Sequence, residues 1–206
     1  VDVNLIDEFA RSNALLPLDS YLKNWTSLGD FPESLLKSFT WNNRLYGVAK
    51  DFSTLCLYYN KAIFDKAKIP YPKDGMTYKD FYKMLSRLKA AGVETPVVVN
   101  ADLNRMIPFI NAYGGKVVDE NLRIAFRDPK SKAAITDYIN LVARDKLGAE
   151  ASSVGAGWEG EAFGKENVAM IMSGPWCLGF LKGSYPNVFK NIGVVEMPKD
   201  KQKASM

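Results

Sequence analysis

The sequence predicts an α/β fold. Short apolar runs typical of strands alternate with capped helix patterns over most of the 206 residues. Hydrophobic residues make up 47% of the chain, which is enough for one sizeable core or two small ones. No apolar run approaches the ~18–20 residues that a membrane-spanning helix needs. We therefore expect a folded globular chain rather than a disordered or membrane-spanning one.

The first fifty residues are predicted to form short elements. Residues 1–6 alternate between apolar and polar side chains, which predicts a strand. The Asn42-Asn43 pair is typical of a hairpin turn. The other elements expected here are a short helix within residues 7–22, a turn at 15–18, a short helix at 32–39 and a hairpin at 41–48.

From residue 55 onward the patterns are stronger. Residues 55–59 predict a strand, and Asn60 can cap the helix that follows. Thr77 and Asp80 approximate a capping box, and apolar residues then recur at helical spacing until Gly92 ends the helix. This helix is the best defined element of the sequence.

The next strand and helix lie between residues 96 and 115. Residues 96–99 predict a buried strand, and Asp102 is a candidate N-cap for the helix after it. Gly114-Gly115 should end this helix. Pro108 is expected in its first turn or at a kink.

The last third of the chain continues the alternation. Asp128-Pro129 combines an N-cap with a proline at the first helical position, and Gly148 is expected to close that helix. The remaining predicted elements are short strands at 116–118 and 122–125, a helix at 158–163, a strand at 168–172, a helix at 175–181 and a strand at 192–195.

Four segments are candidates for a ligand site, because ligands of open α/β sheets bind beyond the carboxyl ends of the strands. They are Asp7-Glu8, the residues around Asp51, Asn100–Asn104 and Ser173–Trp176.

The segment that ends at Trp176 is the most informative. Gly174 permits a tight turn and Pro175 suits a helix start, so Trp176 is expected on a stiff support near the crevice. A flat indole face suits the C–H face of a sugar. The alternative is that Trp176 packs in the core.

Other candidates have equally concrete alternatives. Asp102 and Asn104 could line the crevice, where carboxylate and amide groups suit polyol hydroxyls, or they could serve in helix capping. Asp51 could bind ligand or form a surface ion pair with Lys50. Two further candidate platforms, for which packing is the alternative, are Trp41 and Trp158.

Composition excludes several chemistries. The chain has no His, which removes His bases, Ser-His-Asp triads and His metal sites. It has two cysteines, too few for a Cys-rich zinc site. One of them, Cys177, stands at a helix start, where the helix dipole could lower its pKa. The net charge of +4 is spread along the chain, so we expect no nucleic-acid partner.

Two catalytic patterns are also incomplete. Gly164-Lys165 lacks the first glycine and the Ser or Thr of a phosphate-binding loop. Glu159 and Glu161 lie two apart on a predicted helix and so point in different directions, which disfavours them as a glycosidase pair. We expect neither a cofactor nor a bound metal.

Several phrases of the sequence match one pattern in order and spacing. They are Asp7-Glu8-Phe9 with Leu15–Leu18, Tyr46-Gly47-Val48 with Leu57–Lys61, Thr77–Phe81, Phe163–Trp176 and Met197-Pro198. Together they resemble the extracellular solute-binding proteins of family 1, the maltose-binding-protein-like components of ABC importers. The resemblance extends over essentially the whole chain.

This resemblance implies a class II periplasmic-binding-protein-like fold, with two α/β lobes joined by a hinge and a sugar in the cleft between them. It implies a sugar-binding subunit of an ATP-driven importer rather than an enzyme. Such a subunit captures a mono- or oligosaccharide by stacking and hydrogen bonds and delivers it to membrane permease subunits. It is periplasmic or extracellular, in some cases with an N-terminal lipid anchor.

The family also implies a chain nearly twice as long as this one. Because the sequence opens as a strand already under way and stops in a loop, we expect a segment of a longer protein. The resemblance divides it into a partial first lobe at 1–50, a second lobe at 51–198 and a returning segment at 199–206. By position, Trp176 resembles the sugar-stacking Trp of the family, and the residues that resemble its polar cleft positions are Asp102, Asn104, Asp7 and Glu8.

Two other classes of function stay open. A carbohydrate-active hydrolase would need two carboxylates that face each other ~5–10 Å apart across a cleft. A scaffold or regulatory module would keep the two-lobed fold but lack convergent polar groups around Trp176.

Overall fold

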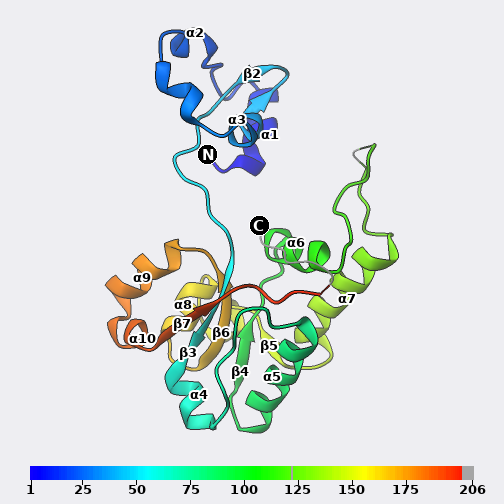
Figure 1. Ribbon diagram of the computed structural model, residues 1–206, viewed down its shortest axis with the longest axis vertical. Helices are drawn as coiled ribbons and strands as arrows, with labels where there is room; N and C mark the ends of the chain where they lie inside the picture. The colour runs from blue at the N-terminus through cyan, green and yellow to red at the C-terminus, as the bar shows by residue number, and fades with distance from the viewer. Residues whose placement is uncertain (122, 201–206) are drawn as a thin grey trace. The chain divides into compact units, whose positions relative to one another are not determined.

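The computed structural model describes residues 1–121 and 123–200 and divides the chain into two compact units, Val1–Phe52 and a second unit that begins at Ser53. Both units contain helices and strands (Figure 1). The first unit carries the candidate residues Asp7, Glu8, Trp41 and Asp51. The second carries Asp102, Asn104, Trp158 and Trp176.

The first unit combines a two-stranded hairpin with short helices. In chain order its elements are the 3-10 helix η1 (Val3–Leu5), α1 (Ile6–Arg11), α2 (Asp19–Leu22), the 3-10 helix η2 (Thr26–Asp30), α3 (Glu33–Ser38), β1 (Thr40–Trp41) and β2 (Arg44–Leu45). The predicted hairpin is confirmed, since β1 and β2 pair antiparallel. Asn42 and Asn43 connect them with φ angles of 49° and 59°, the positive values that a tight hairpin turn needs.

The predicted strand at residues 1–6 is wrong. This segment forms η1 and the start of α1 instead. Ile6 and Ala10, four residues apart, are each 2% exposed, whereas Val1 and Val3 are exposed. The buried side chains therefore follow the helical spacing of four residues. The apolar residues of the alternating pattern, Val1 and Val3, do not pack in a core.

A five-stranded mixed sheet organises the second unit. Its strands are β3 (Cys56–Asn60), β4 (Thr95–Val98), β5 (Gly148–Ala149), β6 (Val168–Ser173) and β7 (Ile192–Val195). They lie in the order β5-β4-β6-β3-β7, and β3 runs antiparallel to both of its neighbours. Strand β4 is parallel to β5 and β6. The start of β3 consequently lies at the edge where β4 and β6 end.

Helices connect these strands. They are α4 (Lys61–Ala67), α5 (Tyr78–Ala90), α6 (Leu103–Ala112), α7 (Pro129–Ala143), the 3-10 helix η3 (Ser152–Val154), α8 (Glu159–Gly164), α9 (Trp176–Ser184) and α10 (Pro186–Lys190). Four helix starts are capped as the sequence predicts. The side chains of Asn60, Thr77, Asp102 and Asp128 each accept a hydrogen bond from a backbone N–H in the first turn.

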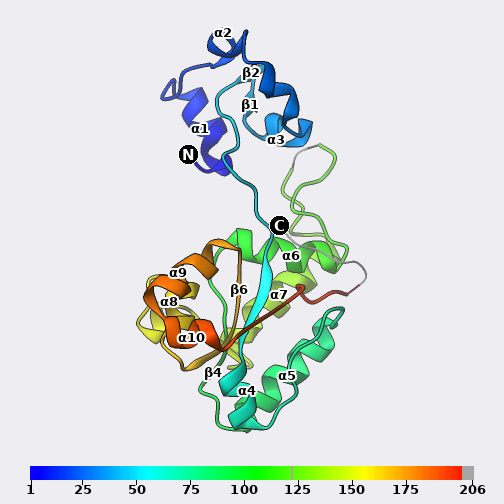
Figure 2. The same ribbon diagram turned by 60° about the vertical axis from the view of Figure 1, so that its left-hand side comes forward.

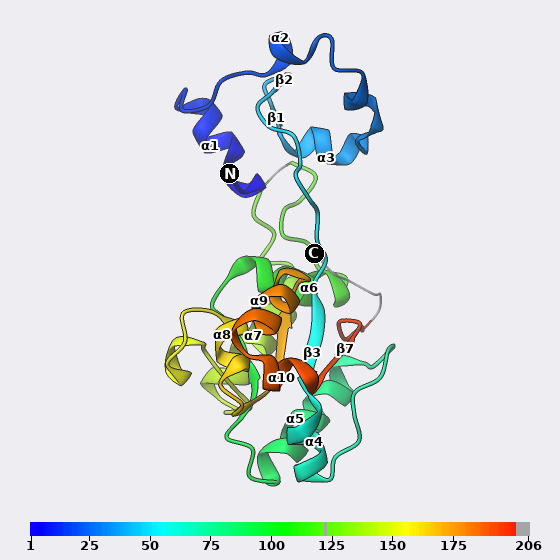
Figure 3. The same cartoon turned by 90° about the vertical axis from the view of Figure 1, so that its left-hand side faces the viewer.

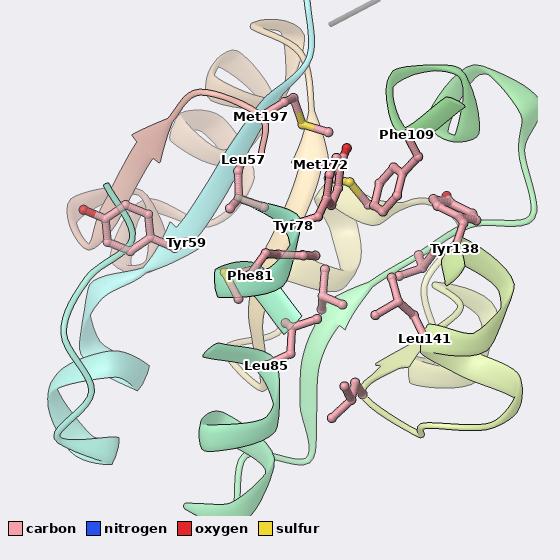
Figure 4. Packing of buried hydrophobic residues seen from close by; sticks show 14 of the residues in the cluster. Leu57, Tyr59, Tyr78, Phe81, Leu85, Phe109, Tyr138, Leu141, Met172 and Met197 are labelled. Carbon is pink, nitrogen blue, oxygen red and sulfur yellow. The ribbon is translucent and has the colours of Figure 1, made fainter. Parts of the chain in front are cut away.

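The sheet is covered on both faces. Helices α5, α6 and α7 cover one face, and α8, α9 and α10 cover the other (Figures 2 and 3). The strands supply alternate residues to the two layers: Leu57 and Tyr59 pack with the first group of helices and Tyr58 with the second. In the first layer Phe81, Leu85 and the other side chains of Figure 4 fill the space between sheet and helices.

Several local expectations need correction. Gly148 does not close the preceding helix, because α7 ends at Ala143 and Gly148 begins β5. Pro108 lies inside α6 and beyond its first turn, so the first-turn alternative is wrong, while the kink stays a prediction. The strands expected at 116–118 and 122–125 reduce to one isolated bridge between Val118 and Ile124, with Leu122 outside the described residues. Helix α10 was not predicted.

Candidate functional site

The candidate site lies in the second unit, at the edge of the sheet where β4 and β6 end. Strand register places Cys56, at the start of β3, beside Ser173, at the end of β6. Asn100 follows the end of β4 at this edge. Trp176 opens α9 three residues after Ser173. The edge therefore collects residues from four elements, as expected for the ligand side of an α/β sheet.

Trp176 is mounted directly against Gly174. A Cβ atom on Gly174 would lie 2.1 Å from indole Cζ3 of Trp176, so only glycine leaves room for the ring. The Tyr58 hydroxyl donates a hydrogen bond of 2.9 Å to the Gly174 carbonyl oxygen and holds the turn to the sheet. The indole is nevertheless 43% exposed. Trp176 is thus supported from below and open to solvent, as a stacking platform requires.

The role of Gly174 differs from the one predicted. Its φ angle lies outside the left-handed region, in contrast to Gly75, Gly92, Gly114 and Gly155. The turn itself therefore does not require glycine here. Close approach of the Trp176 ring does.

A buried carboxylate lies beneath this edge. Glu159, the first residue of α8, is 4% exposed. Its Oε1 accepts hydrogen bonds from Arg105 Nη2 at 2.6 Å and Ser173 Oγ at 3.1 Å, and its Oε2 accepts from Asn100 Nδ2 at 3.0 Å. Three donors from α6, β6 and the segment after β4 thus fix one carboxylate, as buried charges require.

The same network holds Asn100 in place. Its backbone carbonyl accepts a hydrogen bond of 2.8 Å from the Tyr138 hydroxyl, and its Oδ1 accepts one of 3.4 Å from the Ala151 N–H. Asn100 therefore connects α7, the chain after β5 and Glu159. Asn100 and Glu159 are therefore each held by hydrogen bonds to more than one segment of the chain.

Arg105 links the network to the indole. Its side chain is 14% exposed, and its Cζ lies 5.7 Å from the centroid of the Trp176 ring, within cation–π range. Its Nε is buried without a hydrogen-bond partner in the described part of the chain. One guanidinium edge is thus held by Glu159, and the group retains further N–H donors.

The local charge is more negative than positive. Burial raises the pKa of the Tyr138 hydroxyl, and the negative charges of Asp102, Glu159 and Glu150 act in the same direction. Arg105 acts in the opposite direction. The charged groups that act on the Tyr138 hydroxyl are thus one guanidinium and three carboxylates.

Asp102 and Asn104 lie at the start of α6, in the same unit as Trp176. Asp102 Oδ1 accepts a hydrogen bond of 2.9 Å from the Asn104 N–H, so the capping alternative holds for Asp102. Both side chains are partly exposed, and α6 also supplies Arg105. Their contact with a ligand stays a prediction.

Trp158 and Trp41 pack against other rings. Trp158 lies 4.8 Å from Phe180 in an edge contact and is partly buried against the cluster under α8 and α9. Trp41, in the first unit, makes an edge contact of 6.2 Å with Tyr46. These ring contacts are the packing alternative that was named for Trp158 and Trp41.

The acidic candidates of the first unit are exposed. Asp51 forms an ion pair of 3.0 Å with Lys50, the alternative named for it. Asp7 and Glu8 lie in the first turn of α1 and line a shallow hollow together with Arg11. Their role in binding stays a prediction.

Burial raises the pKa of both cysteine thiols, which disfavours the reactive thiolate. Burial raises the pKa of Cys177 to about 12, so the expected lowering by the helix dipole is wrong. Cys177 is fully buried in the layer under α9, where desolvation of the thiolate outweighs the dipole. Burial also raises the pKa of Cys56, and both thiols are free.

An apolar hollow of about 510 Å³ adjoins the network between α6 and α7. It shares Asn100 and Tyr138 with the network, but most of its lining is apolar, including Leu103, Met106 and Phe126. Its chemistry suits hydroxyl groups less well than the edge around Trp176.

Sequence reasoning located Trp176 but missed Arg105 and Glu159 as partners. Fifty-four positions separate these two residues, so their contact depends on the fold. The positions of Asn100 and Ser173 just beyond strand ends were the one local signal, and both were within the candidate segments.

No cluster of three or more acidic or Cys side chains in the described ranges could hold a metal ion. None of the helices described combines the length and apolar character needed to cross a membrane.

The sequence matches the family of bacterial extracellular solute-binding proteins over residues 1–204, and the chain belongs to that family. No curated protein matches the sequence. The predicted family is therefore confirmed.

Solved structures share the fold. The Listeria monocytogenes ABC substrate-binding protein Lmo0181, in complex with cycloalternan, has a TM-score of 0.84 and 23% identity, covering 97% of this chain and 52% of that one. Maltose-bound MalE3 of T. maritima has a TM-score of 0.80 and 19% identity, covering 100% and 54%. The GacH receptor of Streptomyces glaucescens, also solved with acarbose, has a TM-score of 0.81 and 25% identity, covering 98% and 52%.

The chain spans about half the length of these relatives. Its fold is the α/β fold of periplasmic-binding-protein-like sugar-binding proteins, present in part. The family and these relatives are solute-binding proteins rather than enzymes.

Proposed function

We propose that the protein is the sugar-capturing subunit of an ATP-driven importer and that Trp176 is the platform on which the sugar stacks. The observation that carries this proposal is the exposed indole on its glycine support, with Arg105 and the buried Glu159 network beside it. Bound sugars in related structures of the same fold support it.

The binding mechanism follows from the chemistry of a sugar. One face of a pyranose presents C–H groups that pack on an indole, while its hydroxyls need donors and acceptors at the rim. Arg105 offers donors there, and Asp102 and Asn104 offer further polar groups from the start of the same helix.

Closure of two lobes would complete the site. The second unit would contribute Trp176 and its neighbours, and a first lobe that includes residues 1–50 would contribute contacts such as Asp7 and Glu8. The ligand then favours the closed state by no more than its difference in affinity between closed and open states.

Two alternatives have less support. A hydrolase built on Glu159 and Glu161 would need both carboxylates at the substrate. Glu159 is already bonded by three donors, and Glu161 Oε2 accepts a hydrogen bond of 2.7 Å from the Gly157 N–H. A scaffold without ligand would not require polar groups around an open indole.

The proposal also covers the protein partners and the location of the protein. Permease subunits of an importer are the proposed protein partners. The periplasm or the cell exterior is the proposed location, with an N-terminal lipid as the proposed anchor. The extracellular solute-binding family supports these assignments.

Isothermal titration of the full-length protein tests the proposal. The panel contains neutral sugars (D-glucose, D-galactose, D-tagatose, maltose and maltotriose), amino acids and divalent cations. We expect saturable heat with at least one sugar and none with the other classes. Tight binding of an amino acid or a metal, with no sugar bound, would overturn the proposal.

A further inference from the structure

Arg105 and Glu159 form the one ion pair of the described residues in which both side chains are largely buried, at 14% and 5% exposure. The other ion pairs lie on the surface or are partly exposed, as with Lys116 and Glu120. A buried pair is often no more stabilising than apolar residues of similar volume. Its position beside an open indole is therefore better explained by binding than by folding.

We propose that Arg105 is a ligand-contacting residue that determines specificity, and that Glu159 is the positioning residue that fixes its guanidinium. Together they select uncharged sugars over acidic ones. This inference rests on the proposed function and deepens it.

The geometry of Glu159 supports the positioning role. Ser173, Asn100 and Arg105 donate to its two oxygens from three separate segments. These three bonds fix the position of the carboxylate. Arg105 Nη2, bonded to it at 2.6 Å, is thereby fixed as well. A long, flexible side chain thereby becomes a fixed donor, which lowers the entropy lost when a ligand binds.

The unused donors of Arg105 support the contact with ligand. A guanidinium carries five N–H groups, and the hydrogen bond to Glu159 uses one of those on Nη2. Nε is buried and has no acceptor within the described ranges. Because Cζ is 5.7 Å from the centroid of Trp176, a sugar on this indole brings its hydroxyl or ring oxygens close to the guanidinium.

Charge explains the selection for neutral ligands. Glu159, at 2.6 Å, offsets the charge of Arg105. Asp102 caps the helix that carries Arg105, and Glu150 lines the adjoining hollow with Asn100, so two further carboxylates lie near the network. An acidic sugar would therefore meet an excess of negative charge, whereas hydroxyls still gain the donors of Arg105.

Matched pairs of neutral and acidic sugars test this inference in the full-length protein. The pairs are D-glucose with D-glucuronate, D-galactose with D-galacturonate, and maltose with maltobionate, each measured by isothermal titration at neutral pH. We expect wild type to prefer the neutral member by about tenfold or more. Arg105→Ala should weaken neutral binding by about tenfold or more and widen the preference, since it removes a positive charge.

Glu159→Gln should shift the preference the other way. It removes a negative charge and releases Arg105. The affinity for the neutral sugar should therefore fall by about three- to tenfold, and the ratio of neutral to acidic affinity should become smaller. A merely structural role would weaken both members of a pair equally. Arg144→Ala is the matched control, because it removes an Arg from the exposed pair with Asp145, and it should leave affinities within about twofold.

A double variant provides a test that does not leave a buried charge unpaired. Arg105→Met with Glu159→Met replaces the pair by apolar side chains of similar length. It should bind sugars weakly but keep the wild-type ratio of neutral to acidic affinity, because the net charge of the site is unchanged. Wild-type affinity in this variant would overturn the inference.

Each failure is distinguishable. Sugar binding that depends on Trp176 but is unaffected by Arg105→Ala, or a preference unmoved by Glu159→Gln, overturns this inference and leaves the proposed function standing. Absence of binding to every sugar in wild type overturns the proposed function and this inference with it.

Discussion

Trp176 rests on Gly174 so closely that no larger residue fits beneath the ring. The clash would involve Cζ3 and Cη2, which are the far end of the Trp176 side chain, with Cζ3 at 2.1 Å from the added Cβ. The indole can rotate away from such a clash, whereas the backbone below it is held by Tyr58. A substitution at Gly174 should therefore affect binding more than folding.

Gly174→Ala tests this argument. We expect sugar affinity to fall by about tenfold as the indole is displaced, with little change in the midpoint of thermal unfolding. Gly179→Ala, in the same helix but with nothing within 4 Å of its added Cβ, is the control. It should leave affinity unchanged and stabilise the protein by up to about 1 kcal/mol. Equal effects of the two variants would contradict the role given to Gly174.

At the residue scale, the sequence predicts features that depend on residues close together in the chain. A glycine, a proline and a tryptophan after a buried strand indicated an indole at the crevice, because the turn and the helix start are neighbours in sequence. Arg105 and Glu159 could not be paired from sequence. Their contact exists because α6 and α8 both begin at one edge of the sheet.

Helix starts are the elements that sequence predicted best. Thr77 illustrates the reason: its Oγ1 accepts a hydrogen bond of 3.1 Å from the Asp80 N–H and donates one of 2.6 Å to the Asp80 carboxylate. Both partners lie within one helical turn, so the signal is local. The segment at residues 1–6 failed for the opposite reason, since burial of Ile6 and Ala10 against the rest of the first unit decided its period.

Removal of this cap should destabilise the second unit. We expect Thr77→Ala to lower the free energy of unfolding by about 1 kcal/mol, because an N–H at the start of α5 loses its acceptor. Urea denaturation followed by circular dichroism measures the change. Ser86→Ala, in the same helix, is the control. It removes an exposed hydroxyl that donates a hydrogen bond to the Tyr82 carbonyl oxygen, and it should change the free energy of unfolding by less than about 0.5 kcal/mol. No difference between the two variants would argue against the cap.

Buried tyrosines make the stability of the fold depend on pH. Burial raises the pKa of Tyr58, Tyr78 and Tyr138, which are at most 3% exposed. A phenol is neutral below its pKa, and in the unfolded chain it ionises near pH ~10. As the pH rises past that value, the unfolded state releases protons before the folded state does. Stability that is present below pH ~10 is therefore lost above it.

Unfolding in urea between pH ~8 and ~11 checks this pH dependence. We expect the midpoint to be constant up to pH ~9.5 and to fall above it. Absorbance at 295 nm, which reports phenolate, should show that part of the tyrosines ionise only on unfolding. Ionisation of every tyrosine in the folded protein near pH ~10 would contradict the burial of these side chains.

The arrangement of the whole molecule was only partly predictable. Alternation of strands and helices predicted the α/β class, and ordered phrases predicted the family that residues 1–204 match. The strand order β5-β4-β6-β3-β7 and the antiparallel course of β3 depend on long-range pairing, such as Cys56 with Ser173. Neither follows from local patterns, because strand neighbours are far apart in sequence.

The affinity of a Trp176→Ala variant for the sugar that wild type binds best is the most direct test of the central claim, that a sugar stacks on this indole. Trp25→Ala, which removes a 40% exposed Trp of the first unit, is the matched control. In isothermal titration we predict a loss of about 1–3 kcal/mol of binding free energy for Trp176→Ala and none for Trp25→Ala. Unchanged affinity in Trp176→Ala would contradict the account.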